Sequence, residues 1–169
     1  MRQQCYLVAI YLNWLIYIAG LAYFLSARNF IAAAAWIIAL PLALWGYIKI
    51  FPRISPAMGY GSVEDVPAAA STGAAAGSPE VRIYTALSCP FCPLVKRRLE
   101  ALRARMGFSL VEVDVTLKPG LLLEKQIRAV PVVEAGRDRL VGNATSEQLA
   151  RLIAGAARRL AAHESTDGS

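Results

Sequence analysis

The N-terminal third of the chain carries two long apolar runs, one over residues 6–26 and one over residues 30–50. Neither run has the polar stripe that a helix on the surface of a soluble protein shows. Each contains about 20 residues, enough for a helix to cross a hydrocarbon core of roughly 30 Å. Only residues 27–29 separate the runs, so the two helices must be antiparallel. The pattern predicts a transmembrane helical hairpin, with residues 1–51 forming a membrane anchor.

Two other interpretations of these runs are a signal peptide and a buried hairpin of a soluble protein. The first run is too long for a signal peptide, and a second run follows it directly. A soluble hairpin would need the polar stripe that is missing. Arg2, Lys49 and Arg53 flank one side of the predicted membrane and Arg28 flanks the other, so the positive-inside rule places both termini in the cytosol. We therefore expect an integral protein of the cell inner membrane with a cytoplasmic C-terminal domain.

Residues 52–79 are rich in Pro, Gly, Ala and Ser and show neither helical nor strand periodicity. This composition is typical of a flexible linker. Such a linker would let the domain that follows move on the order of 30 Å from its anchor. At the other end of the chain, residues 164–169 are predicted to form a disordered tail.

Residues 80–163 show the alternating patterns of a compact α/β domain. Strand patterns cover residues 81–86 and 109–115, and residues 131–142 read as two strands around a tight turn. Helical patterns cover residues 92–106, 121–129 and 145–163. The predicted order is β-α-β-α-β-β-α, whose first three elements form a right-handed parallel unit. In the helix over 92–106 the basic residues, Arg98 among them, lie largely off the apolar face. Thr145 and Gln148 form a capping box at the start of the last helix.

The chain has a formal net charge of +6. A moderate basic excess suits an anionic membrane surface or acidic partners. No basic patch interleaved with aromatic residues accompanies it, so we expect no nucleic-acid partner.

Two of the three cysteines, Cys89 and Cys92, follow the first predicted strand of the domain and open the helix after it. The positive end of that helix would stabilise a thiolate on Cys89 and lower its pKa. Pro90 suits the first helical position, where no backbone donor is needed. A Cys89 thiolate can attack a substrate disulfide, and Cys92 can then attack the mixed disulfide and release the reduced substrate.

Metal binding is the main alternative for this pair. A structural zinc site needs four ligands, and beyond the pair the chain offers only Cys5, at the membrane edge, and His163. We expect Cys5 to be an inert interfacial thiol and no metal to be resident. A module that relays a soft metal ion or sulfur remains open. A Cys-x-x-Cys motif beside a βαβ pattern favours dithiol redox chemistry.

Pro131 is predicted to be a cis-proline that abuts the cysteines. Backbone groups at such a position can pair with an extended substrate, and Val130 is the candidate contact for a peptide or for glutathione. The alternative is a proline that merely begins an edge strand.

These residues carry a resemblance to the thioredoxin-fold superfamily, and specifically to its glutaredoxin-like branch, over residues 80–162. Cys-Pro-Phe-Cys resembles the glutaredoxin Cys-Pro-Tyr-Cys motif with Phe91 in place of Tyr, and Lys96 stands where that family often has lysine. The segment AVPVV resembles its Thr-Val-Pro segment, and LVGNATSEQLARLI its glycine turn before the last helix. The resemblance implies that Cys89 is the nucleophile, Cys92 the resolving thiol and Pro131 the cis-proline.

The sequence departs from that family at the glutathione site. The family usually has an acidic pair after the glycine, whereas residues 143–146 contain no carboxylate, and Ala129 replaces the usual threonine. These departures favour a flavoprotein reductase over glutathione as the reductant, and we expect no tightly bound cofactor.

The sequence therefore predicts a membrane-anchored thiol–disulfide oxidoreductase. Its expected partners are protein disulfides, including those of membrane proteins, a reductase or glutathione, and the lipid bilayer.

Overall fold

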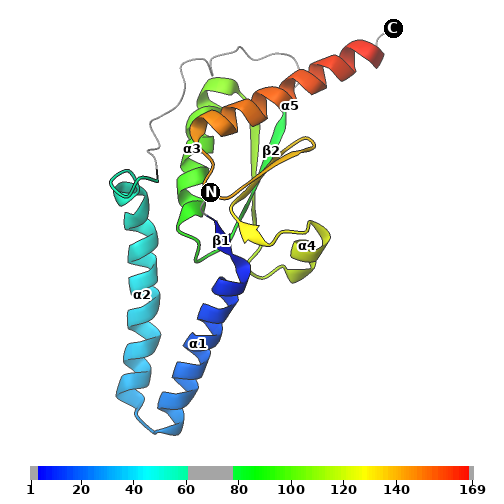
Figure 1. Ribbon diagram of the computed structural model, residues 1–169. Helices are drawn as coiled ribbons and strands as arrows, with labels where there is room; N and C mark the ends of the chain where they lie inside the picture. The colour runs from blue at the N-terminus through cyan, green and yellow to red at the C-terminus, as the bar shows by residue number, and fades with distance from the viewer. Residues whose placement is uncertain (1–3, 61–77, 168–169) are drawn as a thin grey trace.

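The computed structural model describes residues 4–60 and 78–167. It contains a helical N-terminal region followed by a mixed α/β domain (Figure 1). A short strand, β1 (Cys5–Tyr6), leads into helices α1 (Leu7–Ser26) and α2 (Phe30–Ile54). The two helices lie side by side as the predicted hairpin. The side chain of Asn29 caps α2 by accepting a hydrogen bond from the Ala32 N–H at 3.1 Å.

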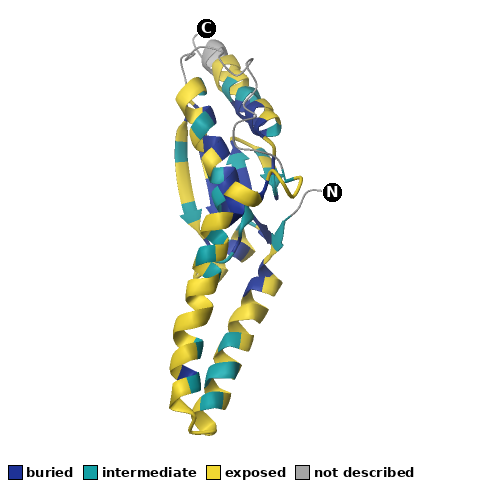
Figure 2. Ribbon diagram, turned by 90° about the vertical axis from the view of Figure 1, so that its left-hand side faces the viewer, coloured by how far each residue is buried: buried dark blue, intermediate teal, exposed yellow. Residues whose placement is uncertain are grey.

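The helices of the hairpin leave most of their apolar side chains uncovered. Only 11% of the apolar window of α1 and 6% of that of α2 is buried (Figure 2). The core helix of a soluble domain would bury most of such a window. By length and composition both helices are able to cross a membrane.

The domain is built on a four-stranded sheet in the order β3-β2-β5-β6. Its strands are β2 (Glu80–Thr85), β3 (Ser109–Asp114), β5 (Val132–Ala135) and β6 (Asp138–Val141). Strands β2 and β3 are parallel, and the pairs β2–β5 and β5–β6 are antiparallel. Helix α3 (Phe91–Met106) crosses between β2 and β3 as the predicted parallel unit requires.

The main core of the domain lies between the sheet and two helices that contact each other, α3 and α5 (Ser146–Asp167). Val81 and Ile83 of β2, Leu99 of α3 and Leu149 and Ile153 of α5 are all buried there. The predicted capping box is present, because the backbone N–H groups and side chains of Thr145 and Gln148 pair reciprocally at 3.3 Å.

Three predicted boundaries are wrong. The hairpin does not end at residue 51: α2 continues to Ile54 with Pro52 inside it, and Phe51 is packed against Phe91 of the domain. Helix α4 covers only Pro119–Glu124, since Gln126 has a φ of 51° and Ala129–Val130 form a further strand, β4. Helix α5 extends to Asp167, into the predicted tail. The rest of that tail and most of the predicted linker, residues 61–77, lie outside the described residues.

The hairpin is docked on the domain, although the linker prediction implied a domain free to move. Phe51 of α2, Tyr60 and Phe91 of α3 form an aromatic cluster, with ring centroids 5.2–5.7 Å apart. Next to it, the guanidinium of Arg98 donates to the Tyr60 carbonyl at 2.9 Å. Arg98 also donates to the side chain of Asn143 at 2.7 Å and to the Ala144 carbonyl at 2.8 Å. Contrary to the sequence prediction, Arg98 is buried and ties the end of the hairpin to the domain.

Replacing Arg98 with alanine should lower the free energy of unfolding by about 2–4 kcal/mol, because buried oxygens lose a charged donor. Thermal or denaturant unfolding of the full chain in detergent measures this loss. Arg97, the exposed neighbour of Arg98 on α3, provides the control, and its replacement with alanine should change stability by about 0.5 kcal/mol or less. Equal effects of the two replacements would contradict the anchoring role of Arg98.

Candidate functional site

Cys89 and Cys92 lie at the junction between β2 and α3. Strand β2 ends at Thr85, and the chain then turns so that the Cys89 N–H donates to the Ala86 carbonyl at 3.2 Å. Pro90 is the N-cap of α3, one position before the predicted one, and Cys92 lies in the first helical turn. Both thiols are therefore held at the helix N-terminus by backbone geometry.

Strand β4 brings the predicted cis-proline to the cysteines. The Val130–Pro131 peptide bond is cis. The Cys89 thiol lies 3.8 Å from the Val130 carbonyl oxygen, and both residues are buried. The structure thus brings together Cys89, Cys92, Val130 and Pro131. The substrate-binding roles of Val130 and Pro131 remain predictions.

The third cysteine, which sequence reasoning set aside, lies at the same place. The sulfur atoms of Cys89 and Cys5 lie 2.8 Å apart and share a hydrogen bond. Cys5 reaches this position because β1 pairs antiparallel with β4, with Cys5 opposite Val130 and Tyr6 opposite Ala129. Cys5 therefore lies against the other two cysteines, and the expectation that its thiol is inert stays a prediction. A two-residue strand ahead of an apolar helix carries no periodic signal from which this pairing could have been predicted.

The surroundings of Cys89 oppose the thiolate that the sequence predicts. The hydrogen bond with Cys5 lowers the pKa of Cys89, but the hydrogen bond with Cys92, burial and the charge of Cys92 raise that pKa by more. The backbone N–H of Cys92 also lowers the pKa of Cys89, as expected at a helix N-terminus, without reversing the balance. The hydrogen bond with Cys89 and burial likewise raise the pKa of Cys5. In this closed arrangement both groups are held as thiols.

Lys96 and Asn143, two positions that the sequence comparison with glutaredoxins concerned, contact other residues of this chain. Lys96 pairs with Glu112 of β3, which raises the pKa of Lys96 and fixes its charge beside the sheet. Asn143, which stands where the family has an acidic pair, accepts from Arg98 and donates to the Tyr60 carbonyl at 3.1 Å. Asn143 therefore contacts the end of the hairpin.

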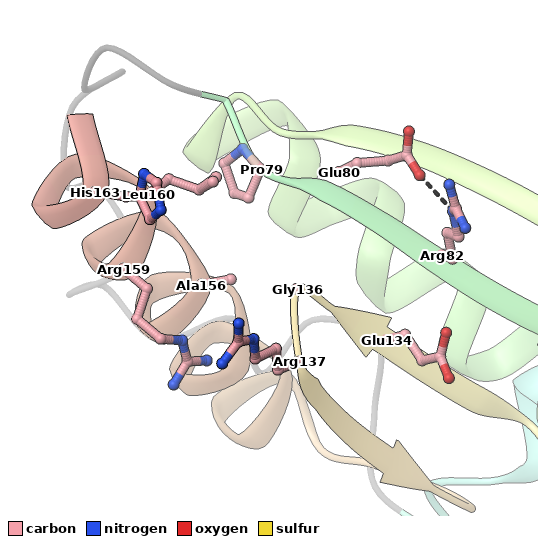
Figure 3. A pocket seen from close by; sticks show the side chains of 10 residues that line it. All are labelled: Pro79, Glu80, Arg82, Glu134, Gly136, Arg137, Ala156, Arg159, Leu160 and His163. Atoms are coloured by element: carbon pink, nitrogen blue, oxygen red, sulfur yellow. Dashed lines mark hydrogen bonds and ion pairs between the residues drawn. The ribbon is translucent and has the colours of Figure 1, made fainter. Parts of the chain in front are cut away.

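A separate pocket of about 630 Å³ lies at the other end of the sheet (Figure 3). Pro79 and Glu80, at the start of β2, line it together with Arg159 and His163 of α5. Arg82 pairs with Glu80 there, and Arg159 pairs with Asp138. None of the described residues that line this pocket is a cysteine, so it is not part of the thiol site.

The chain matches no family model and no curated protein. It is similar to two solved structures of alkylhydroperoxide reductase AhpF from Enterococcus faecalis (V583). One is the NTD_N/C domain of AhpF, with 22% identity and a TM-score of 0.48, and the other is a mutant of AhpF, with 21% identity and a TM-score of 0.47. Each match covers 63% of this chain and 53% of the other, so the chain spans about half their length.

Proposed function

We propose that this chain is a membrane-anchored dithiol oxidoreductase that exchanges disulfides through Cys89 and Cys92. The observation that carries the proposal is the placement of both thiols at the N-terminus of α3, with Cys89 against the Val130 carbonyl and the cis bond to Pro131. The order of the four-stranded sheet and the β-α-β-α-β-β-α succession of its strands and helices, with the short β4 outside that sheet, agree with the thioredoxin-like fold that the sequence resemblance implies.

The proposed reaction proceeds by two thiol–disulfide exchanges. The Cys89 thiolate attacks one sulfur of a substrate disulfide, forms a mixed disulfide and releases the other substrate sulfur as a thiolate. The Cys92 thiolate then attacks Cys89 Sγ, which releases the second substrate thiolate and leaves a Cys89–Cys92 disulfide. Two electrons have passed from the cysteine pair to the substrate. An external dithiol, a reductase or glutathione restores the reduced pair.

The hairpin supports a site that works close to a bilayer. Residue Cys5, beside Cys89, is only two positions before the first residue of α1. If α1 spans a membrane, Cys89 lies at the membrane-proximal end of the domain. Disulfides of membrane proteins near the surface are then the substrates that the anchor brings within reach at a high effective concentration. We assign the domain to the cytoplasmic face of the cell inner membrane, where it would act as a reductant.

Turnover with a small disulfide tests the proposal. The full chain in detergent, supplied with dithiothreitol, should accelerate reduction of hydroxyethyl disulfide, and the oxidised protein should yield Cys89 and Cys92 joined in one non-reduced peptide. Parallel assays with glutathione, and with a flavoprotein reductase plus thioredoxin, identify the physiological class of reductant. Tight binding of Cu(I) without turnover would instead favour the relay of a soft metal ion. Among residues 4–60 and 78–167, no group of three or more His, Cys, Asp or Glu side chains is arranged to hold a metal ion.

A further inference from the structure

The N-terminal strand occupies the edge of β4 next to the proposed catalytic thiols. Besides the pairing of Cys5 with Val130 and Tyr6 with Ala129, the Leu7 N–H donates to the Arg128 carbonyl at 3.2 Å. Strand β1 thus runs antiparallel to β4 up to the residue before the cis bond (Figure 1). An extended segment of the chain's own N-terminus lies where the sequence analysis places the backbone of a substrate.

Side-chain alternation along β1 directs Cys5 into the site. Neighbouring side chains of a strand point to opposite faces. Tyr6 is 58% exposed, whereas Cys5 is half-buried and its sulfur lies 2.8 Å from that of Cys89. The backbone N–H of Phe91 also acts on Cys5 and lowers its pKa, although the hydrogen bond with Cys89 and burial raise that pKa overall. Cys5 therefore faces the same helix N-terminus as Cys89.

The first turns of α1 hold this arrangement in place. Leu7 and Ile10 are buried in the same apolar cluster as Cys89 and Cys92. Further along α1, the Tyr11 hydroxyl donates to the Thr116 carbonyl, after β3, at 3.3 Å. The position of Cys5 thus follows from side chains of α1 and from the strand pairing, in addition to the contact between the two sulfurs.

We propose that Cys5 is a third redox cysteine, which exchanges a disulfide bond with Cys89 while β1 is docked on β4. This inference rests on the proposed disulfide exchange at Cys89. Beginning from the Cys89–Cys92 disulfide, the Cys5 thiolate attacks Cys89 Sγ. The bond between Cys5 and Cys89 forms, the bond between Cys89 and Cys92 breaks, and Cys92 leaves as a thiolate that takes up a proton. No electrons are gained or lost overall, so the step needs no further oxidant.

The same attack resolves a mixed disulfide. When Cys89 is joined to a substrate sulfur and β1 docks on β4 again, attack by Cys5 on Cys89 Sγ releases the substrate thiolate and leaves the Cys5–Cys89 disulfide. Cys5 and Cys92 are then two alternative resolving thiols for one nucleophile. The chain has three cysteines in all, and these are the three.

The full chain with Cys92→Ser, in detergent, tests this role. After treatment with oxidised glutathione, non-reduced peptide mapping should find Cys5 joined to Cys89. Glutathione left on Cys89 should be at least about tenfold less abundant than in the Cys5→Ser/Cys92→Ser protein, since a positioned intramolecular thiol outcompetes one in solution. Equal glutathione adducts in the two proteins would overturn the proposal.

A thiol moved by one residue is the matched control. In the Cys5→Ser/Tyr6→Cys/Cys92→Ser protein the thiol lies on the opposite face of β1, so the adduct on Cys89 should persist as it does without Cys5. If this protein forms its internal disulfide as readily as Cys92→Ser does, a loose N-terminus rather than the docked strand explains the reaction, and the proposal fails. Unmodified protein equilibrated with reduced and oxidised glutathione provides a second test, because it should contain both the Cys5–Cys89 and the Cys89–Cys92 disulfide.

Disulfide formation in the Cys5→Ser protein shows whether a failed test refutes only the role of Cys5 or the proposed function itself. If Cys89 and Cys92 join there but Cys5 never joins Cys89 in the other proteins, only the role of Cys5 is refuted. If Cys89 and Cys92 do not join, the proposed function itself is refuted.

Discussion

Replacing Cys89 with serine is expected to lower the rate of disulfide reduction by at least about three orders of magnitude. A hydroxyl at this position is not ionised near neutral pH and does not form a mixed disulfide, so both exchanges are lost. The measurement is kcat/KM for hydroxyethyl disulfide with full-length protein in detergent. Unchanged thermal unfolding of the variant would show that the loss is chemical.

The Cys92 variants complete this test. Cys92→Ser leaves the nucleophile intact, so the first exchange still proceeds, and the second exchange then depends on Cys5 alone. With Cys5 also replaced, mixed disulfides between Cys89 and a protein substrate should accumulate and be visible as adducts on a non-reducing gel. Turnover by Cys89→Ser at the rate of the unmodified protein would exclude the mechanism.

Elements with strong periodic signals were predicted well from the sequence. The strand patterns over residues 81–86 and 109–115 correspond to β2 and β3, and the helical pattern over 92–106 corresponds to α3. In β2 and α3 local preference and burial favour the same structure, and β3, in which no residue is buried, is held by its pairing with β2. The capping box at Thr145 was predicted for the same reason, because its partner is only three residues away.

Features that depend on distant contacts were not predicted. Arg98 was placed on the solvent side of its helix, yet its guanidinium has carbonyl acceptors at Tyr60 and Ala144, which no local pattern connects to it. Cys5 and Val130 are far apart in sequence, and a strand of two residues shows no alternation. The helix N-terminus that lowers the pKa of Cys89 is visible in the sequence, whereas the hydrogen bond with Cys92 and the burial that raise this pKa depend on the packed structure.

The start of the hairpin helps to bury Cys89, the proposed nucleophile. Cys89 is only 1% exposed, and Leu7 and Ile10 belong to the cluster that covers it. A substrate disulfide must contact Cys89 Sγ directly, so β1 and the start of α1 have to leave β4 before an external substrate is attacked. Undocking then opens the edge of β4, and it removes both the Cys5 hydrogen bond that lowers the pKa of Cys89 and much of the burial that raises that pKa.

Weakening this docking should therefore expose the nucleophile. Leu7→Asn removes a buried apolar side chain and puts an amide in the cluster. The expected loss of about 2–3 kcal/mol of docking free energy would raise the undocked population about 30- to 150-fold. The rate at which N-ethylmaleimide alkylates Cys89 at neutral pH, followed by peptide mapping, should rise by a similar factor. Val8→Asn changes the exposed neighbour of Leu7 in the same helical turn and should leave the rate nearly unchanged.

The effect of Leu7→Asn on the alkylation rate of Cys89 should decrease as the pH rises. Docking raises the pKa of Cys5, because its hydrogen bond with Cys89 and its burial exist only in the docked form, so that form holds the Cys5 proton more tightly than the undocked form does. Docking is therefore fully favoured below the ordinary thiol pKa of about 8.5 and weakens as the pH rises above it. After correction for the thiolate fraction of a model thiol, the rate advantage of Leu7→Asn over the unmodified protein should shrink in alkaline solution. An advantage that grows with pH, or a Cys89 in the unmodified protein that reacts as fast as a free thiol at neutral pH, would contradict a nucleophile covered by the N-terminal strand.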